Sequence, residues 1–185
     1  MLVSSALYFL LSLLILVSCA KDNFEDTAIK EKSLELQVLE VYDIGKDALE
    51  SGDVLYAAKK FNEVETLFPQ SDLAPRSALM AAYSYYIQDY YGDTIAELER
   101  FIRVYPFHKD IPYAHYLMGI SYFEQIVDEK KDLQSIKSAK TKFNFILKEY
   151  PNTEYALDAE FKISLIDDIL ASKEMYIGRY YYDKK

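Results

Sequence analysis

Three aromatic–proline pairs divide this chain at regular intervals: Phe68-Pro69, Tyr105-Pro106 and Tyr150-Pro151. The first two prolines are 37 residues apart, and the last two are 45 apart, which is the same interval with 8 residues added. Proline cannot continue an α-helix, and it pushes the residue before it out of the helical region. Each pair is therefore predicted to end a helix, and the regular spacing predicts a structure built from repeated units.

Small and large apolar residues occupy fixed positions relative to these prolines. Eight residues before the prolines lie Phe61, Leu98 and Phe143, and four residues earlier lie Ala57, Thr94 and Ala139. Small residues occupy a further position of each unit: Gly45, Ala82, Gly119 and Ser164. We expect each small residue on a first helix to face the alanine position of the second helix, so that the two backbones approach closely. Phe61 and its equivalents are expected to fill the space to the next hairpin.

Between the breaks, apolar residues recur at three- and four-residue steps, which is typical of amphipathic helices. We therefore predict an all-α fold, a tetratricopeptide-like superhelix of antiparallel helical hairpins. The predicted units cover about residues 28–69, 72–106, 110–151 and 154–185, the last of them incomplete. The additional residues of the third unit fall around the charged run 128–132, in a loop between its two helices. A helical bundle without repeats is the alternative.

The only cysteine of the chain, Cys19, follows an apolar run over residues 6–17, which is too short for a transmembrane helix and suits a signal peptide. Its context, Leu16-Val17-Ser18-Cys19, resembles the lipobox of bacterial lipoproteins. We predict a signal peptide over residues 1–18, a Cys19 that carries diacylglycerol and an N-acyl chain, and a linker over residues 19–27. The predicted location is the periplasmic face of the outer membrane. No Lys or Arg precedes the run, so a signal anchor or an ordinary secretory signal is the alternative.

Charge and composition argue against several function classes. The net charge of −9 disfavours nucleic-acid binding, which depends on Lys and Arg neutralising phosphates, and it disfavours a basic membrane patch. The two histidines, His108 and His115, occupy a loop and a helix and offer no shared metal geometry. No glycine-rich phosphate loop and no nucleophile motif occurs in the sequence. We predict a protein that is not an enzyme, with no metal and no cofactor beyond the lipid on Cys19.

The first helices of stacked hairpins are expected to line a concave groove that binds an extended peptide. The 18 tyrosines suit such a surface, because each offers a rigid apolar face and one hydroxyl. For more than half of them, packing between helices is the expected role. The predicted groove residues lie about one turn from the small residues of the first helices: Tyr42, Lys46, Arg76, Leu79, Tyr83, Tyr86, Tyr113, Tyr116, Ile120 and Phe123.

Several longer strings go beyond the repeat anchors. They are FPQS (residues 68–71), APRSALMAAY (74–83), RFIRVYPFH (100–108), YAHYLMG (113–119) and KEMYIGRYY (173–181). They resemble the BamD family, the tetratricopeptide lipoproteins of the outer-membrane β-barrel assembly machine. The charged insertion also falls where that family has one.

The resemblance implies a component of the outer-membrane protein assembly complex. Such a component would bind the C-terminal strands of unfolded β-barrel clients, the barrel-forming subunit and other assembly lipoproteins, and so promote insertion into the membrane. Docking to the barrel-forming subunit is expected near the last helix, at Arg179, Tyr180, Tyr181 and Tyr182. Members of the family continue with a further repeat, so we expect part of this contact to be absent from the sequence as given.

Two other function classes stay open at this point. A periplasmic tetratricopeptide scaffold that coordinates cell-wall or envelope division proteins would share the aromatic–proline repeat ends. It would not be expected to carry the string at 173–181 or the charged insertion. A regulatory subunit of an enzyme is the third class, because a binding groove has no chemical signature.

Overall fold

The computed structural model describes residues 33–126 and 133–184. In these ranges seven helices follow one another along the chain: α2 (Leu34–Glu50), α3 (Val54–Leu67), α4 (Leu73–Tyr86), α5 (Tyr91–Val104), α6 (Ile111–Glu124), α7 (Leu133–Glu149) and α8 (Glu154–Asp183). The predicted signal peptide, Cys19, the linker and the charged run 128–132 lie outside the described residues.

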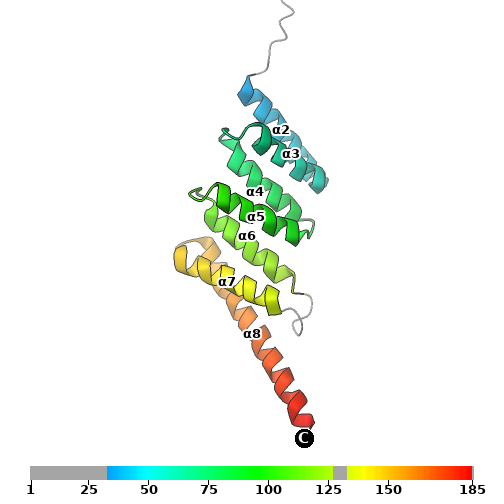
Figure 1. Cartoon of the computed structure of the whole chain (residues 1–185), viewed down its shortest axis with the longest axis vertical. Helices are drawn as coiled ribbons and strands as arrows, with labels where there is room; N and C mark the ends of the chain where they lie inside the picture. The colour runs from blue at the N-terminus through cyan, green and yellow to red at the C-terminus, as the bar shows by residue number, and fades with distance from the viewer. Residues whose placement is uncertain (1–32, 127–132, 185) are drawn as a thin grey trace, which may run out of the picture. The chain divides into compact units, whose positions relative to one another are not determined.

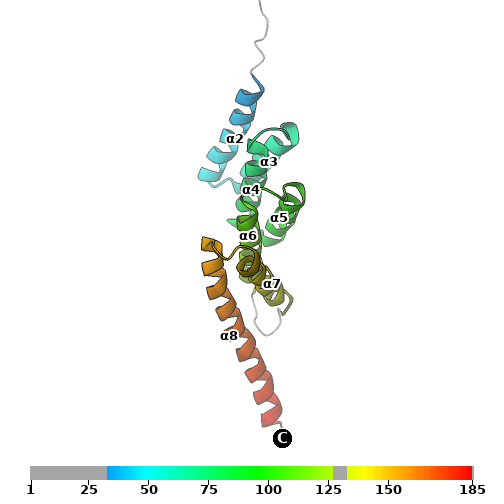
Figure 2. The same ribbon diagram turned by 90° about the vertical axis from the view of Figure 1, so that its left-hand side faces the viewer.

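The helices pack as successive hairpins, α2 with α3, α4 with α5 and α6 with α7 (Figure 1). Each hairpin contacts the next element, because α3 packs on α4, α5 on α6 and α7 on α8. The first helices also meet one another, α2 with α4 and α6 with α8. Figure 2 shows α5 and α7 together on one side of α4 and α6. The predicted all-α, tetratricopeptide-like fold is confirmed.

Local chemistry explains where the helices end. Phe68 and Tyr105 follow α3 and α5 with φ of −131° and −122°, outside the helical region, directly before a proline. In the turn from α2 to α3, Gly52 takes a φ of +86°, which costs a glycine little because it has no Cβ. Asp53 then caps α3 by accepting a hydrogen bond from the backbone N–H of Tyr56 at 3.2 Å.

The small residues of the first and third hairpins meet a phenylalanine of their own hairpin. A Cβ added to Gly45 would lie 2.9 Å from the ring of Phe61, and one added to Gly119 would lie 2.8 Å from the ring of Phe143. The nearest side chain to each of these glycines is thus the large ring of its own hairpin, which was expected to fill the space to the next hairpin. Phe61 also packs in one cluster with Ala81 of the next hairpin.

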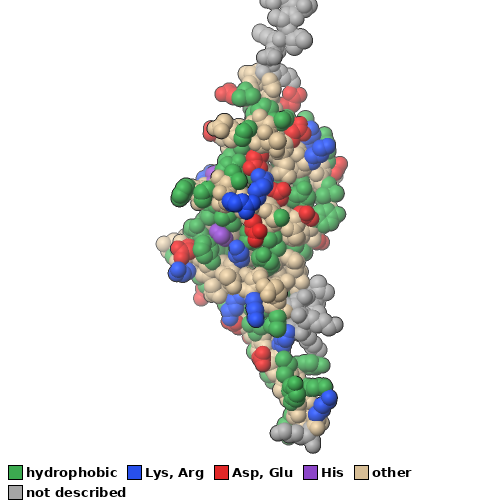
Figure 3. All heavy atoms as spheres, viewed as in Figure 1, with side chains coloured by type: hydrophobic (Ala, Val, Ile, Leu, Met, Phe, Trp, Pro, Cys, Tyr) green, Lys and Arg blue, Asp and Glu red, His purple; other side chains and the backbone are tan. Residues whose placement is uncertain are grey.

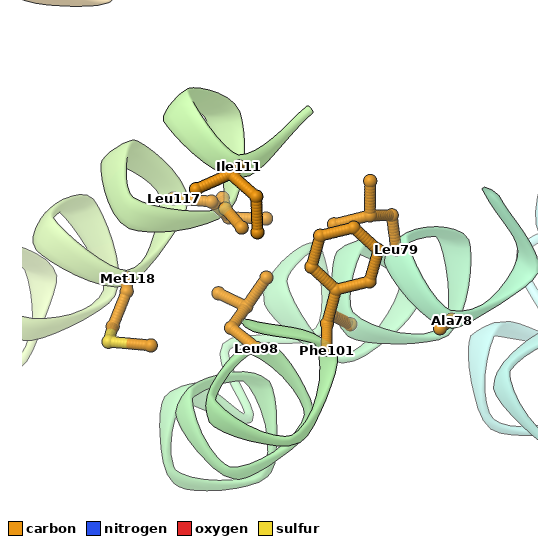
Figure 4. Close-up of a cluster of buried hydrophobic side chains, with 9 residues drawn as sticks. Ala78, Leu79, Leu98, Phe101, Ile111, Leu117 and Met118 are labelled. Atoms are coloured by element: carbon orange, nitrogen blue, oxygen red, sulfur yellow. The ribbon is translucent and has the colours of Figure 1, made fainter. Parts of the chain in front are cut away.

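The middle hairpin solves the same packing problem with different volumes. Its small residue is Ala82 and its large residue is Leu98, and both belong to a cluster buried among α4, α5 and α6 (Figure 4). Figure 4 labels Leu98 together with the cluster members Ala78, Leu79, Phe101, Ile111, Leu117 and Met118. Ala82 has one methyl group more than the glycines at the equivalent positions. Leu98 is correspondingly smaller than the phenylalanines at its equivalent positions.

An ion-pair network joins the first two hairpins on the side of the second helices. Arg100 of α5 contacts Glu65 of α3 and Glu97 of α5, each at 2.7 Å. The Tyr105 hydroxyl donates a hydrogen bond to Glu65 at 3.0 Å. The Glu65 side chain is 10% exposed, so its charge depends on these partners. Burial and the bond to Glu65 raise the pKa of Tyr105 to about 12.

The second half of α8 differs from the rest of the array. Beyond Leu170, nearly every residue of this helix is exposed, and the helix runs past its last contacts with α7 (Figure 1). Ser164, which shares the small-residue position with Gly45 and Gly119, is exposed because no second helix of the described chain packs on it. Among the described residues, none of the helices has the length and apolarity that crossing a membrane requires.

Candidate protein-binding surface

Five tyrosines from three first helices are here called the tyrosine face: Tyr83 and Tyr86 of α4, Tyr113 and Tyr116 of α6, and Tyr155 of α8. Tyr83 and Tyr86 lie near enough to Tyr113 to add to its raised pKa. The rings of Tyr83 and Tyr86 are 6.4 Å apart, and the ring of Tyr155 lies 5.8 Å from Tyr113 and 5.2 Å from Tyr116. The first helices lie side by side, which brings together tyrosines that are far apart in sequence.

Burial raises the pKa of four of these phenols, those of Tyr86, Tyr113, Tyr116 and Tyr155. Burial raises the pKa of Tyr113 to about 12, and the nearby Tyr83 and Tyr155 add to the effect. Burial also raises the pKa of Tyr116, whose hydroxyl donates a hydrogen bond to Asp158 at 2.8 Å. The face therefore offers packed aromatic rings with polar rims. Such a surface suits binding rather than catalysis.

The structure corrects three of the predicted groove residues. Tyr42, Leu79 and Ile120 are each 6% exposed, so they are core residues with almost no surface to offer a partner. The ring of Tyr42 packs against Phe61 at 5.4 Å, inside its own hairpin. Helical spacing placed these residues on the correct helices, but equivalent positions of different repeats differ in burial, since Ile120 is buried and its counterpart Tyr83 is exposed.

The other predicted groove residues keep some exposed surface. Tyr83 is 36% exposed, and Tyr86, Tyr113 and Tyr116 are half-buried. Arg76 is exposed and lies over the ring of Tyr42, with 5.8 Å between the guanidinium carbon and the ring centre. Lys46 pairs with Asp43 at 3.3 Å. Phe123 packs against the same buried cluster as Tyr86, Tyr116 and Tyr155, and it lies under Lys162 at 4.8 Å.

Sequence reasoning missed Tyr155 and its neighbour Asp158, because it stopped at the third hairpin. The signal was present in the repeat phase. Asp158 lies seven residues after Pro151, as Arg76 follows Pro69 and Tyr113 follows Pro106. Applying the phase to α8 would have placed Asp158 beside the predicted groove residues and drawn attention to the tyrosine one turn before it.

The residues predicted to dock the barrel-forming subunit all lie near the end of α8. Arg179, Tyr180, Tyr181 and Tyr182 are exposed, and the ring of Tyr180 packs edge-on against Tyr181 at 5.5 Å. Lys184 lies 4.4 Å from the centre of the Tyr180 ring. Figure 3 shows hydrophobic side chains gathered near this end of the helix. This surface is separate from the tyrosine face.

The two histidines take different structural roles. The ring of His115 stacks on Phe145 of α7 at 4.4 Å, and burial lowers its pKa to about 4, with Lys142 adding to the effect. The ring of His108 packs edge-on against Phe101 at 5.6 Å. In the described ranges, no group of three or more His, Cys, Asp or Glu side chains is placed to hold a metal ion.

Comparison with known proteins identifies the family. Residues 32–185 match the family model YfiO, described as an outer membrane lipoprotein. The chain belongs to the BamD family. This confirms the predicted family and its location at the outer membrane. The prediction that the chain is not an enzyme agrees with the relatives, which are named as assembly factors.

Three relatives of the BamD family carry the name outer membrane protein assembly factor BamD. That of Caulobacter vibrioides is 41% identical over 152 residues, which are 82% of this chain and 48% of the relative. That of Rickettsia prowazekii is 36% identical over 145 residues, 78% of this chain and 58% of the relative. That of Neisseria gonorrhoeae is 31% identical over 180 residues, 91% and 66% respectively. The chain therefore spans about half to two thirds of the length of these BamD relatives.

Among solved structures, the first tetratricopeptide domain of Spaghetti (RPAP3) bound to an HSP90 peptide has a TM-score of 0.54 with this chain. Its sequence identity is 16%, and the match covers 74% of this chain and 94% of that one. The solution structure of the first tetratricopeptide domain of human RPAP3 matches with the same TM-score at 18% identity. These likenesses support the repeat fold of this BamD-family chain and nothing about its partners.

Proposed function

We propose that this protein is a non-catalytic component of the outer-membrane protein assembly complex. In this role it binds unfolded β-barrel clients and the barrel-forming subunit, and so promotes insertion into the outer membrane. The observation that carries the proposal is the 41% identity to an assembly factor over 82% of this chain. Acylation of Cys19 would hold the array at the periplasmic face of the membrane.

The tyrosine face supports the client-binding part of the proposal. Its rings are fixed by packing against one another, so binding a peptide costs little side-chain entropy. Aromatic rings with hydroxyl rims favour an extended peptide that carries an aromatic residue, such as the last strand of an unfolded β-barrel. Arg76 lies outside the tyrosine face, over the ring of Tyr42, on the same helix as Tyr83 and Tyr86.

The first experiment is to purify the lipidated protein from mildly solubilised outer membranes and identify the co-purifying proteins by mass spectrometry. Recovery of a large β-barrel protein with periplasmic domains is expected. Recovery of cell-wall or division proteins without such a barrel would contradict the proposal and favour the scaffold alternative.

Client binding is tested with a labelled peptide that ends in an aromatic residue, taken from the last strand of an outer-membrane β-barrel. Tyr83→Ala is expected to weaken binding about tenfold, the usual effect of removing an interface aromatic residue. The matched control is Tyr56→Ala on α3, since Tyr56 is 42% exposed and Tyr83 is 36% exposed. Equal losses from both variants would argue against the tyrosine face as the binding surface.

A further inference from the structure

The turn between α4 and α5 can be compared directly with the turn between α2 and α3. A shift of 37 residues superposes the two turns in the repeat phase, so that Gly52 corresponds to Asp89 and Asp53 to Tyr90. Both turns contain one residue with positive φ at the same position, Gly52 at +86° and Asp89 at +61°. The two turns thus have the same backbone requirement and different side chains.

The first turn meets this requirement at lower cost than the second. Gly52 adopts positive φ with no steric penalty, whereas Asp89 tolerates it better than most residues but has a Cβ that makes it less favourable than glycine. Asp53 caps α3 with its side chain, whereas Tyr90 occupies the N-cap of α5 and makes no capping hydrogen bond. Glycine and aspartate at positions 89 and 90, as in the first turn, would therefore make the protein more stable than Asp89 and Tyr90 do.

The second turn also exposes apolar surface. Ile87 is 41% exposed and Tyr90 is 42% exposed, and their counterparts in the first turn are the polar residues Glu50 and Asp53. Tyr91 follows, with its ring 6.0 Å from that of Tyr86 and its hydroxyl donating to Asp89 at 2.7 Å. We call Ile87, Asp89, Tyr90 and Tyr91 the α4–α5 tip. Exposed apolar groups at the expense of stability mark an interaction surface.

The charge around the α4–α5 tip is negative. Residues 77–99 contain no Lys or Arg, while Asp89 and Asp93 lie in and beside the turn. Glu124, at the end of α6, is close enough to add to the raised pKa of Tyr91, whose main cause is the bond to Asp89. An aromatic surface with acidic neighbours attracts Arg and Lys, which bind ring faces and carboxylates together.

The chain shows the same chemistry where a cation of its own is available. Lys60 lies over Tyr56 at 5.6 Å, Arg76 over Tyr42 at 5.8 Å and Lys184 over Tyr180 at 4.4 Å. In the described part of the chain, no cation of this kind is found over Tyr90 or Tyr91. The missing cation must come from elsewhere if these rings are used in the same way.

We propose that the α4–α5 tip is a docking site for a protein segment that carries arginine or lysine. The basic side chain lies on Tyr90 or Tyr91 and pairs with Asp89, Asp93 or Glu124, and an apolar neighbour of the segment covers Ile87. This inference does not depend on the proposed role of the tyrosine face, because the two surfaces use different residues.

The test exchanges the chemistry of the two turns. The double variant Asp89→Gly/Tyr90→Asp gives the α4–α5 turn the glycine and aspartate of the α2–α3 turn, and one lost aspartate balances one gained, so the net charge stays at −9. Its Tm is expected to rise roughly 2–4 °C, since a favourable cap and a relaxed turn replace costly residues. General attraction of cations by an acidic protein is unchanged in this variant.

The probe is a labelled short peptide in which arginine alternates with leucine, compared with its citrulline counterpart of equal size and no charge. The natural protein is expected to prefer the arginine peptide, and the double variant to lose affinity for it by roughly tenfold or more. Chemical-shift changes should centre on residues 87–93 and Glu124. Unchanged affinity in the double variant, or shift changes spread over the whole acidic surface, would overturn the proposal.

A second variant covers the case in which the double variant does not fold. Tyr90→Ser removes the exposed ring and leaves a side chain that can cap α5. It is expected to keep the natural Tm or raise it and to weaken the arginine peptide at least severalfold. The matched control, Tyr56→Ser, removes an equally exposed tyrosine that already has its own cation. If both serine variants bind the peptide as the natural protein does, the tip is not a docking site.

Discussion

At the scale of single residues, each hairpin combines a small residue on its first helix with a large apolar residue on its second helix. Gly45 pairs with Phe61 and Gly119 with Phe143, at distances that leave no room for a methyl group. Ala82 and Leu98 occupy the equivalent positions of the middle hairpin and belong to one buried cluster. The sequence predicted these six positions from spacing alone, but it could not predict which pairs touch, because spacing does not give the direction of a side chain.

Gly119→Ala tests this combination of a small and a large residue. The added methyl would meet the ring of Phe143 at 2.8 Å, so we expect a loss of about 1–3 kcal/mol in the free energy of unfolding, measured with urea. Combining Gly119→Ala with Phe143→Leu reproduces the natural Ala82–Leu98 pair and should recover part of the loss. Strict additivity of the two changes would contradict the exchange, since residues in contact normally couple by about 0.5–3 kcal/mol.

Replacing Gly52 and Gly92 by alanine should change the free energy of unfolding in opposite directions. Gly52 has a φ of +86°, so Gly52→Ala is expected to destabilise the protein by about 1 kcal/mol. Gly92 lies in the first turn of α5, a Cβ there would meet nothing within 4 Å, and Gly92→Ala should stabilise by about 0.5–1 kcal/mol. Thermal unfolding of both variants checks the pair, and a loss of Tm in Gly92→Ala would show that the space is not free.

His115 should make stability fall as the pH is lowered. Burial lowers its pKa to about 4 from an ordinary 6.5, so the unfolded chain binds a proton more readily than the folded one. The stability it contributes is complete above pH 6.5 and is lost as the pH falls through 6.5 towards 4. His115→Leu is expected to flatten the difference in unfolding free energy between pH 7 and pH 4.5. An NMR titration of His115 with an ordinary midpoint would refute the assignment.

At the scale of elements, α3 and α5 are joined by the ion pair between Glu65 and Arg100, and breaking it would leave a buried charge without a partner. Glu65 is 10% exposed and Arg100 is 32% exposed, so removing Arg100 leaves a nearly buried carboxylate without its cation. The first two hairpins are therefore coupled by a polar contact as well as by apolar packing between α3 and α4.

Arg100→Ala is expected to lower the unfolding free energy by about 2 kcal/mol, below the loss for a fully buried pair because the guanidinium keeps some water. Arg103→Ala, an exposed position one turn further along α5, is the matched control and should change it by less than about 0.5 kcal/mol. Urea unfolding measures both. A similar loss in the two variants would mean that the contact with Glu65 contributes little.

The helices themselves were largely predictable, and the surface they build was less so. Proline, glycine and apolar spacing act within a few residues, so breaks such as Phe68-Pro69 could be identified from sequence. Whether a side chain one turn from Ala82 is exposed depends on how α4 is rotated against α6. Leu79 and Tyr83 were therefore predicted alike, although Leu79 is core and Tyr83 is exposed.

At the scale of the whole molecule, the array separates residues that hold the fold from residues that are free to bind. The buried clusters use α2 to α7 and the first half of α8, while the second half of α8 is exposed. Surface substitutions far from packed contacts usually change stability little. Binding through the end of α8 can therefore be tested without disturbing the fold.

The double variant Tyr181→Ala/Tyr182→Ala should unfold at the same temperature as the natural protein, because these side chains are 66% and 79% exposed. If the end of α8 docks the barrel-forming subunit, co-purification of that subunit should fall severalfold, measured by quantitative mass spectrometry. Undiminished recovery with the double variant would remove this surface from the proposal.

The pairing of one small and one large residue has a consequence for how such a protein evolves. Because Gly119 is fitted to Phe143 within the same hairpin, a hairpin carries its own internal fit when its coding segment is duplicated. A new copy needs to match only the outer faces of its neighbours. Drift within a hairpin is constrained instead, since a change at one member of the pair is tolerated best when the other follows. In lineages that carry this repeat, a substitution at the small position should therefore be accompanied by one at the large position of the same hairpin.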